Sequence, residues 1–321
     1  MKVAKKLVIL GKEIMPGKGA WLNMDVAKLH TNTAIQVPVI VQRAKKDGPV
    51  ILLMAGMHGD EINGIEVIRR IIRKGWNKPT AGTVICIPVF NIFGFLNVSR
   101  ELPDGRDLNR SFPGSVNGSL ASQFAYHFMK EIAPVVDYVI DFHTGGAQRS
   151  NAPQIRCVFS DKISMELARI FNPPFIVHSS YISKSIREEM HKRNKKILLF
   201  EGGKANSLDE SVINHGMDGI RRILEHFHMR NFKTEPLQKD EPVLIKDSKW
   251  IRATHSGMFN VVVENGCKVA KSEVLGLISD PYGNSERKIK SPIEGYVFCV
   301  NESPIITKGD ALFHIGKEAG E

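Results

Sequence analysis

The chain has 321 residues, enough for two domains, and its 42% hydrophobic and 24% charged residues are typical of globular proteins, which excludes a disordered or fibrous class. Its longest apolar runs, such as residues 50–54, are far shorter than the roughly 20 residues of a membrane-spanning helix, so no membrane is expected as a partner. The formal net charge of +10 would suit a nucleic acid or an anionic substrate. Because the basic residues are scattered and no nucleic-acid-binding motif accompanies them, we expect no nucleic-acid partner.

The N-terminal ten residues are basic and then briefly apolar, and they predict a strand rather than a secretion signal. The four cysteines are widely spaced and lack the C-x-x-C pattern of zinc or redox sites. We therefore expect small buried thiols in a reducing compartment and a cytoplasmic protein.

Strands and helices are predicted to alternate along the first two thirds of the chain. Short alternating runs within residues 1–45 predict strands, and the continuous apolar run of residues 49–56 predicts a strand buried on both faces. An amphipathic helix over residues 61–74 follows. The later elements predicted are strands at 84–89, 135–142 and 197–200 and helices at 120–131 and 218–229. This order predicts an α/β fold with a mixed, mostly parallel sheet flanked by helices.

The composition changes after residue 232, where a polar stretch with two prolines begins and no long helix pattern follows. We therefore predict a catalytic domain over residues 1–235 and a smaller all-β domain over residues 236–321. A weak internal repeat, starting near Ser256 and again near Glu294, predicts a β barrel or sandwich made of two similar halves.

The second domain resembles the biotinyl/lipoyl-type barrel. A carrier domain of that type needs a lysine at an exposed turn, usually between methionines, and the chain has no Met-Lys-Met sequence. We therefore expect this domain to be an accessory lid or an assembly surface. In the second case the protein would be a homo-oligomer.

The H-G-D-E motif of residues 58–61 lies where a predicted buried strand passes into a helix. Open α/β sheets bind ligands beyond the carboxyl ends of their strands, so His58 and Glu61 could hold one metal ion. The spacing alone is weak evidence, because His215 and Asp218 show the same spacing without an evident role.

Two further motifs close predicted strands. The D-F-H-T-G motif of residues 141–145 supplies His143, which would complete a His/Glu/His set of the kind that holds catalytic zinc. The F-E-G-G motif of residues 200–203 supplies Glu201, a candidate general base for a water molecule. From these motifs alone, His143 could also simply close its strand, and Glu201 could cap a helix or pair with a lysine.

A loop with the sequence R-D-L-N-R-S-F-P-G spans residues 106–114 and follows Arg100. Arginine and amide side chains grouped in this way suit a substrate carboxylate, because a guanidinium group binds both carboxylate oxygens. Taken by itself, the loop more often consists of ordinary loop residues than of a substrate-binding group.

In this order, the four motifs resemble those of the succinylglutamate desuccinylase/aspartoacylase family, within the zinc carboxypeptidase (M14-like) superfamily. The resemblance covers about residues 45–230. It implies one Zn²⁺ ion per chain held by His58, Glu61 and His143, with Glu201 as the general base.

The resemblance also implies roles for the arginine-rich loop. Arg100 would polarise the scissile carbonyl and stabilise its oxyanion. Asn109 and Arg110 would bind the free carboxylate of the substrate, and Asp107 would hold the ring of His58 by a hydrogen bond.

The implied function is zinc-dependent hydrolysis of a linear amide bond. The expected substrate is an N-acyl amino acid or a related small amide with a free carboxylate. A metallocarboxypeptidase that acts on short peptides would share the same site and is the alternative enzyme. Outside the enzymes, the alternatives are a non-catalytic zinc-binding protein and a polyanion-binding protein, the latter suggested by the net charge.

Overall fold

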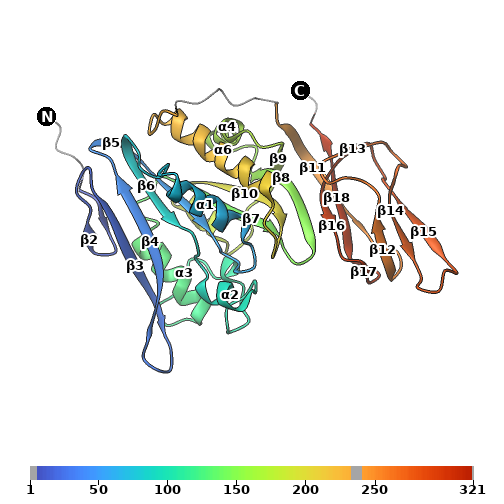
Figure 1. Cartoon of the computed structure of the whole chain (residues 1–321), viewed down its shortest axis with the longest axis horizontal. Coiled ribbons are helices and arrows are strands. Elements are labelled where there is room, and N and C mark those ends of the chain that lie inside the picture. Colours follow the sequence, from blue (N-terminus) through green and yellow to red (C-terminus); the bar gives the residue numbers. More distant parts are fainter. Residues whose placement is uncertain (1–5, 233–240, 320–321) are drawn as a thin grey trace.

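The computed structural model of the chain describes residues 6–232 and 241–319 (Figure 1). Within these ranges, one large sheet of 12 strands has the order β13-β16-β18-β11-β9-β8-β10-β7-β5-β6-β4-β3. Figure 1 shows the N-terminal strands at one end of the molecule and the C-terminal strands at the other. Half of the strand predicted over the first ten residues lies outside the described residues; within them, β1 (Val8–Ile9) forms a hairpin with β2 (Lys12–Glu13).

Eight of the described strands in the large sheet belong to the α/β part of the chain. Its strands in chain order are β3 (Gly19–Lys28), β4 (Ala34–Arg43), β5 (Lys46–Ala55), β6 (Ala81–Ile87), β7 (Tyr138–Gly145), β8 (Arg149–Cys157), β9 (Phe175–His178) and β10 (Lys196–Lys204). The central strands β6, β5, β7 and β10 are parallel, whereas β3, β4 and β8 pair antiparallel with their neighbours. The α/β class and the mixed sheet are thus confirmed. The sheet is mostly parallel only in its centre, because short turns before β4 and β8 reverse the chain direction.

Helices cover both faces of this sheet. On one face lie α1 (Asn63–Arg73), α4 (Lys162–Phe171) and α6 (Glu210–His226), and on the other lie α3 (Leu120–Glu131) and α5 (Ile186–Lys192). In α1, the buried residues Val67, Ile68 and Ile71 recur at helical spacing and form one apolar stripe against the sheet. The helix predicted at residues 120–131 has these bounds, whereas α6 begins eight residues before the predicted start.

Described residues 241–319 form strands and no helix, which confirms the predicted C-terminal β domain. Its strands are β11 (Val243–Arg252), β12 (Gly257–Val261), β13 (Lys268–Val269), β14 (Val274–Ser279), β15 (Glu286–Lys290), β16 (Gly295–Asn301), β17 (Ile305–Ile306) and β18 (Ala311–Glu318). Strands β15-β14-β12-β17 form a second sheet that packs on the first through one apolar core. The short strand of each repeat half pairs with the other half, β13 with β16 and β17 with β12.

The two parts of the chain share the large sheet. Strand β11 pairs parallel with β9, and β16 pairs antiparallel with β8. The predicted boundary between residues 235 and 236 lies outside the described residues. Within the described ranges, no helix combines the length and apolar character needed to cross a membrane.

Candidate active site

The three predicted metal ligands lie together at the carboxyl edge of the central strands. His58 and Glu61 follow β5, and His143 lies near the end of β7. One candidate ligand atom from each of the three side chains lies within 4.8 Å of the others. The residues are buried, with exposed fractions of 2%, 2% and 4%, so the cluster faces an enclosed space.

Close packing explains why a glycine occupies position 59 in the H-G-D-E motif. A Cβ atom on Gly59 would lie 1.8 Å from the backbone carbon of Gly94, in α2 (Ile92–Asn97). The Gly59 N–H donates to the carbonyl oxygen of Ser99 at 3.0 Å. Only glycine lets this turn pack against the backbone of α2, and the turn directs His58 and Glu61 to the same side.

Each oxygen of Glu61 faces one imidazole. Oε1 is 2.8 Å from Nδ1 of His58, and Oε2 is 2.9 Å from Nδ1 of His143. The outer ring nitrogens are also held, since Nε2 of His58 lies 3.2 Å from Asp107 Oδ1 and Nε2 of His143 lies 3.0 Å from Asp141 Oδ2. Carboxylates placed behind imidazoles in this way orient metal ligands, and the His/Glu/His donor set fits zinc.

The charges of this cluster are strongly coupled. Burial alone would lower the pKa of His58, but the charge of Glu61 and the hydrogen bonds with Asp107 and Glu61 together outweigh burial and raise that pKa. The pKa of His143 is raised well above its usual range, because Asp141 and Glu61 outweigh burial. Burial would raise the pKa of Glu61, yet the two imidazoles hold it well below its usual range. A metal ion entering the cluster must therefore displace protons.

Arg100 and Asp107 connect the loop to the cluster. The guanidinium group of Arg100 donates to Asp107 Oδ2, at 2.8 Å from Nη2, and to Glu61 Oε1, at 3.2 Å from Nη1. Burial would raise the pKa of Asp107, but its hydrogen bond with His58 and the positive charges of His58 and Arg100 hold it well below its usual range. Asp107 also accepts the backbone N–H of Asn109 at 2.8 Å, which starts the 3-10 helix η1 (Leu108–Arg110).

Asn109 and Arg110 line the same cavity, but both make bonds within the protein. The Oδ1 atom of Asn109 accepts the backbone N–H of Ile186 at 3.0 Å, which ties the loop to α5. Arg110 is exposed and donates from Nη1 to the carbonyl oxygen of Asn109 at 2.7 Å. The remaining guanidinium donors of Arg110 leave it able to bind an anion.

Glu201 lies on β10 beside the cluster, where the strand is irregular. The register of β10 shifts after Glu201 against both neighbouring strands, and Gly203 has φ +72°. Such a bulge re-aims a side chain, and glycine adopts the left-handed conformation without strain. The E-G-G sequence therefore matches a local bend that turns Glu201 into the cavity. Asn151 donates from Nδ2 to Glu201 Oε2 at 2.8 Å.

The cavity has a volume of about 560 Å³ and contains residues that the sequence did not point to. Three of them are arginines: Arg149, Arg156 and Arg187. Two others, Trp250 and Cys299, come from the C-terminal β domain. No motif surrounds these residues, and β8 and α5, which carry the arginines, were not predicted.

Two of these arginines lie close together: Arg187 is buried and Arg156 is half-buried. Burial and the charge of Arg156 lower the pKa of Arg187, whose guanidinium donates to the carbonyl oxygens of Arg156, Ser179 and Ser180. The Nε atom of Arg156 is buried and has no hydrogen-bond partner within the described residues. It lies 3.9 Å from Glu201 Oε1. Guanidinium donors left open in a cavity favour an anionic ligand.

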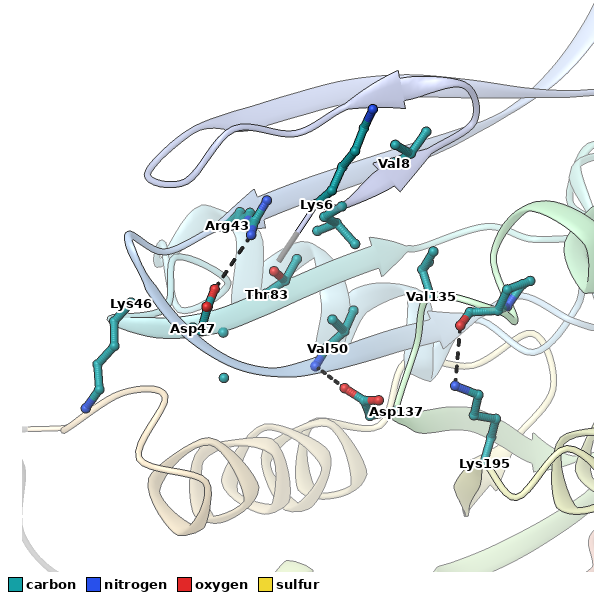
Figure 2. A pocket seen from close by; sticks show the side chains of 14 residues that line it. Lys6, Val8, Arg43, Lys46, Asp47, Val50, Thr83, Val135, Asp137 and Lys195 are labelled. Atoms are coloured by element: carbon teal, nitrogen blue, oxygen red, sulfur yellow. Dashed lines mark hydrogen bonds and ion pairs between the residues drawn. The ribbon is translucent and has the colours of Figure 1, made fainter. Parts of the chain in front are cut away.

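A second cavity, of about 360 Å³, lies at the opposite edge of the sheet, where the parallel strands begin (Figure 2). Its charged groups are engaged locally. Arg43 lies 3.6 Å from Asp47, Asp137 accepts the backbone N–H of Val50 at 2.9 Å, and Lys195 donates to a backbone carbonyl. This cavity gathers no set of candidate ligands.

A buried His/Glu/His cluster at the carboxyl edge of an α/β sheet, inside an arginine-lined cavity, is a candidate metal centre of the kind found in hydrolases. Residues 47–227 match the family model of the succinylglutamate desuccinylase/aspartoacylase catalytic domain, so the chain belongs to that family. The resemblance seen in the motifs is confirmed, and membership places the chain among deacylating hydrolases.

Individual relatives agree with this assignment. The chain is 28% identical over 260 residues to an N-alpha-acetyl-L-2,4-diaminobutyric acid deacetylase of Halomonas elongata. The matched region covers 77% of this chain and 75% of that protein. A product-bound structure of the ectoine utilization protein EutE (DoeB) from Ruegeria pomeroyi has a TM-score of 0.81 at 23% identity, with 94% of each chain covered. A succinylglutamate desuccinylase/aspartoacylase structure from Rhodobacter sphaeroides has a TM-score of 0.81 at 22% identity, covering 94% of this chain and 96% of that one. These structures share the fold of nearly the whole chain.

Proposed function

We propose that this protein is a zinc-dependent amide hydrolase that deacylates an N-acyl amino acid, or a related small amide with a free carboxylate. The observation that carries the proposal is the buried cluster of His58, Glu61 and His143, with one ligand atom of each within 4.8 Å of the others. Glu201 and Arg100 line the same cavity as these ligands. A metal site, a base and a cation for the carbonyl oxygen are thus available in one place.

His58, Glu61 and His143 would hold one Zn²⁺ ion per chain. When bound, zinc lowers the pKa of a water molecule and polarises a carbonyl group. Asp107 and Asp141 keep the two imidazole rings in a fixed orientation through their outer nitrogens.

Glu201 would take a proton from the attacking water and pass it to the leaving amine. Arg100 would stabilise the negative charge that develops on the carbonyl oxygen, by hydrogen bonds aimed from an already ordered guanidinium group. A C–O bond forms, the amide C–N bond breaks, and the products are a carboxylate and a free amine.

The charge of the cavity favours an anionic substrate. Its lining includes five arginines, at positions 100, 110, 149, 156 and 187, and four carboxylates, at positions 60, 61, 107 and 201. A bound zinc ion would add two positive charges. Asn109 and Arg110 would bind the free carboxylate of the substrate through a planar, charge-assisted contact. A free amino group, as in the diaminobutyric acid compound named for the Halomonas relative, would meet like charge here.

The competing enzyme activity is that of a metallocarboxypeptidase, which would use the same cluster and the same carboxylate contact. Hydrolysis of two substrate panels by the zinc-loaded protein separates the two activities. We expect chelator-sensitive release of amino acid from N-acyl amino acids. Release from short peptides alone would identify a carboxypeptidase, and no release from either panel would contradict the proposal.

A further inference from the structure

We propose that Asn151 is a positioning residue that orients Glu201, and that the C-terminal β domain holds Asn151 in place through strand β16. The inference rests on the proposed function, because it takes Glu201 as the general base. It gives the C-terminal β domain a part in turnover that differs from a lid or an assembly surface.

The contact between the two side chains is direct and partly buried. Asn151 is 4% exposed, and its Nδ2 atom donates to Glu201 Oε2 at 2.8 Å. Within the described residues, this is the one side-chain hydrogen bond that Glu201 receives, and the Nε atom of Arg156 lies 3.9 Å from Glu201 Oε1. A general base must be held in reach of its proton, so losing this bond would let the carboxylate rotate away.

The bulge in β10 explains why Asn151 makes this bond. Gln154 is the residue directly opposite Glu201 in the β8–β10 ladder, and Asn151 is opposite Gly203. The Gln154 amide donates elsewhere, to the carbonyl oxygens of Ala152 at 3.2 Å and Phe298 at 3.3 Å. Because of the register shift between Glu201 and Gly203, the Glu201 carboxylate accepts its hydrogen bond from Asn151 and not from Gln154.

The end of β8 that carries Asn151 is held by the C-terminal β domain. Strand β16 pairs with β8 at Cys299↔Asn151 and Val300↔Ser150, and Figure 1 shows the C-terminal strands continuing the sheet at β8 and β9. Asn265 donates from Nδ2 to the carbonyl oxygen of Ser150 at 3.0 Å. The C-terminal β domain thus holds the β8 backbone by strand pairing at Asn151 itself and by a hydrogen bond to its neighbour Ser150.

The first test measures kinetics of three variants of the full chain loaded with zinc. For Asn151→Ala we expect kcat to fall about 10- to 100-fold, as is usual for partners of active-site groups, with bound zinc unchanged. KM should stay within about threefold, because the substrate contacts remain. Asn151→Gln keeps an amide donor and should recover part of kcat. The comparison variant is Gln154→Ala, which removes a buried amide from the same strand that donates to Phe298 of β16 and not to Glu201. It should lower Tm, and it should lower kcat less than Asn151→Ala does.

The second test addresses the domain. Asn265 and Asn301 both belong to the C-terminal β domain and both donate to a carbonyl oxygen, of Ser150 and of Ala311 respectively. Asn265→Ala loosens β8 and should lower kcat by about three- to tenfold, whereas Asn301→Ala should leave it within about twofold. Equal kcat values for these two variants would overturn the role of the domain.

The inference and the proposed function fail in different ways. If the wild type is active and Asn151→Ala keeps full kcat, the inference is overturned and the function stands. If the wild type hydrolyses neither substrate panel, the function fails, and the contact is then judged from Tm values of Asn151→Ala, Glu201→Ala and the double variant. Non-additive Tm changes would support the contact in solution, and additive changes would overturn it.

Discussion

The two edges of the central sheet both carry charged side chains, but those at one edge are mostly exposed and those at the other form a buried cluster. At the edge where the parallel strands begin, Arg43 lies beside Asp47, and Asp137 accepts the backbone N–H of Val50 (Figure 2). At the edge where the parallel strands end, His58, Glu61 and His143 lie together in one buried cluster. Charged side chains at a sheet edge alone do not mark an active site, whereas the convergence of several buried, chemically suited groups favours one.

The largest effect should come from removing a ligand at the carboxyl edge. We expect His58→Ala to lose bound zinc and, with it, at least about 1,000-fold in kcat/KM, because the metal supplies most of the activation of the attacking water. The measurement is zinc per chain by elemental analysis together with the hydrolysis rate. Asp137→Ala, at the opposite edge, is the matched control and should keep both. Stoichiometric zinc in His58→Ala would contradict the ligand assignment.

Removing the base should separate chemistry from metal binding. We expect Glu201→Gln to keep one zinc ion per chain while kcat falls about 100- to 10,000-fold, the usual range for a general base. The side chain keeps its shape and its neighbours, so the fold should be unchanged by circular dichroism. A Glu201→Gln enzyme with near-normal kcat would rule out this residue as the base.

The candidate metal ligands and the proposed base could be predicted because each lies in a short motif at the end of a strand, and strand ends of one orientation meet at one edge. Strand β8 was missed for a physical reason. Its sequence R-S-N-A-P-Q-I-R-C contains a proline and four polar or charged side chains after Arg149, which hides the strand pattern. Two of those side chains, Asn151 and Arg156, are polar because they face the cavity.

Helix α6 begins at Glu210, before the predicted start, and it contains Gly216 and Gly219, whose low intrinsic helix propensity makes its boundary hard to predict. In the fold, a Cβ atom on Gly216 would lie 2.9 Å from Val67, so glycine allows α6 to pack closely on α1. The pairing of β16 with β8 joins residues about 150 positions apart, and no local pattern specifies such a contact. Local sequence patterns therefore do not predict the close packing of these two helices or the pairing of strands far apart in the chain.

A smaller change at the carboxyl edge tests the charge of the cavity. We expect Arg156→Met to lower kcat/KM about 10- to 100-fold for an anionic N-acyl amino acid, the equivalent of one charge-assisted hydrogen bond, with zinc retained. For an N-acyl amino acid with a cationic side chain, the same substitution should have little effect or improve turnover. Equal losses on both substrates would contradict an anion-binding role for Arg156.

The pH dependence of the metal-free protein should show the coupled cluster directly. The pKa values of His58 and His143 are raised in the fold, so their protonation adds stability that is complete below the unfolded value of 6.5 and is lost as the pH rises through the folded values. Glu61, with a lowered pKa, adds stability above 4.5 that is lost as the pH falls. We expect Tm of the chelated protein to fall between pH 6.5 and 9.

The zinc-loaded protein is the control, because bound metal keeps the imidazoles neutral and removes this dependence. A His143→Asn variant without metal should also show a weaker fall of Tm with rising pH than the wild type. A chelated wild type whose Tm is constant from pH 6.5 to 9 would contradict the assigned charges of the cluster.

The smallest effect is expected at the opposite edge. Asp137→Ala removes the acceptor for the Val50 N–H and should cost about 1 kcal/mol of the free energy of unfolding, with kcat/KM unchanged. Asp137→Asn keeps an acceptor and should lose less. Denaturant unfolding of both variants gives the comparison, and a marked loss of turnover in either would show that this edge contributes to function after all.

The most direct measurement of the central claim is a titration of the metal-free protein with zinc, following both bound zinc and the initial rate on an N-acyl amino acid. We expect the rate to rise in proportion to bound zinc and to level off at one ion per chain, with His58→Ala inactive throughout. Full activity before zinc is added, or a rate unrelated to zinc bound at the His58, Glu61 and His143 cluster, would contradict a single catalytic zinc site.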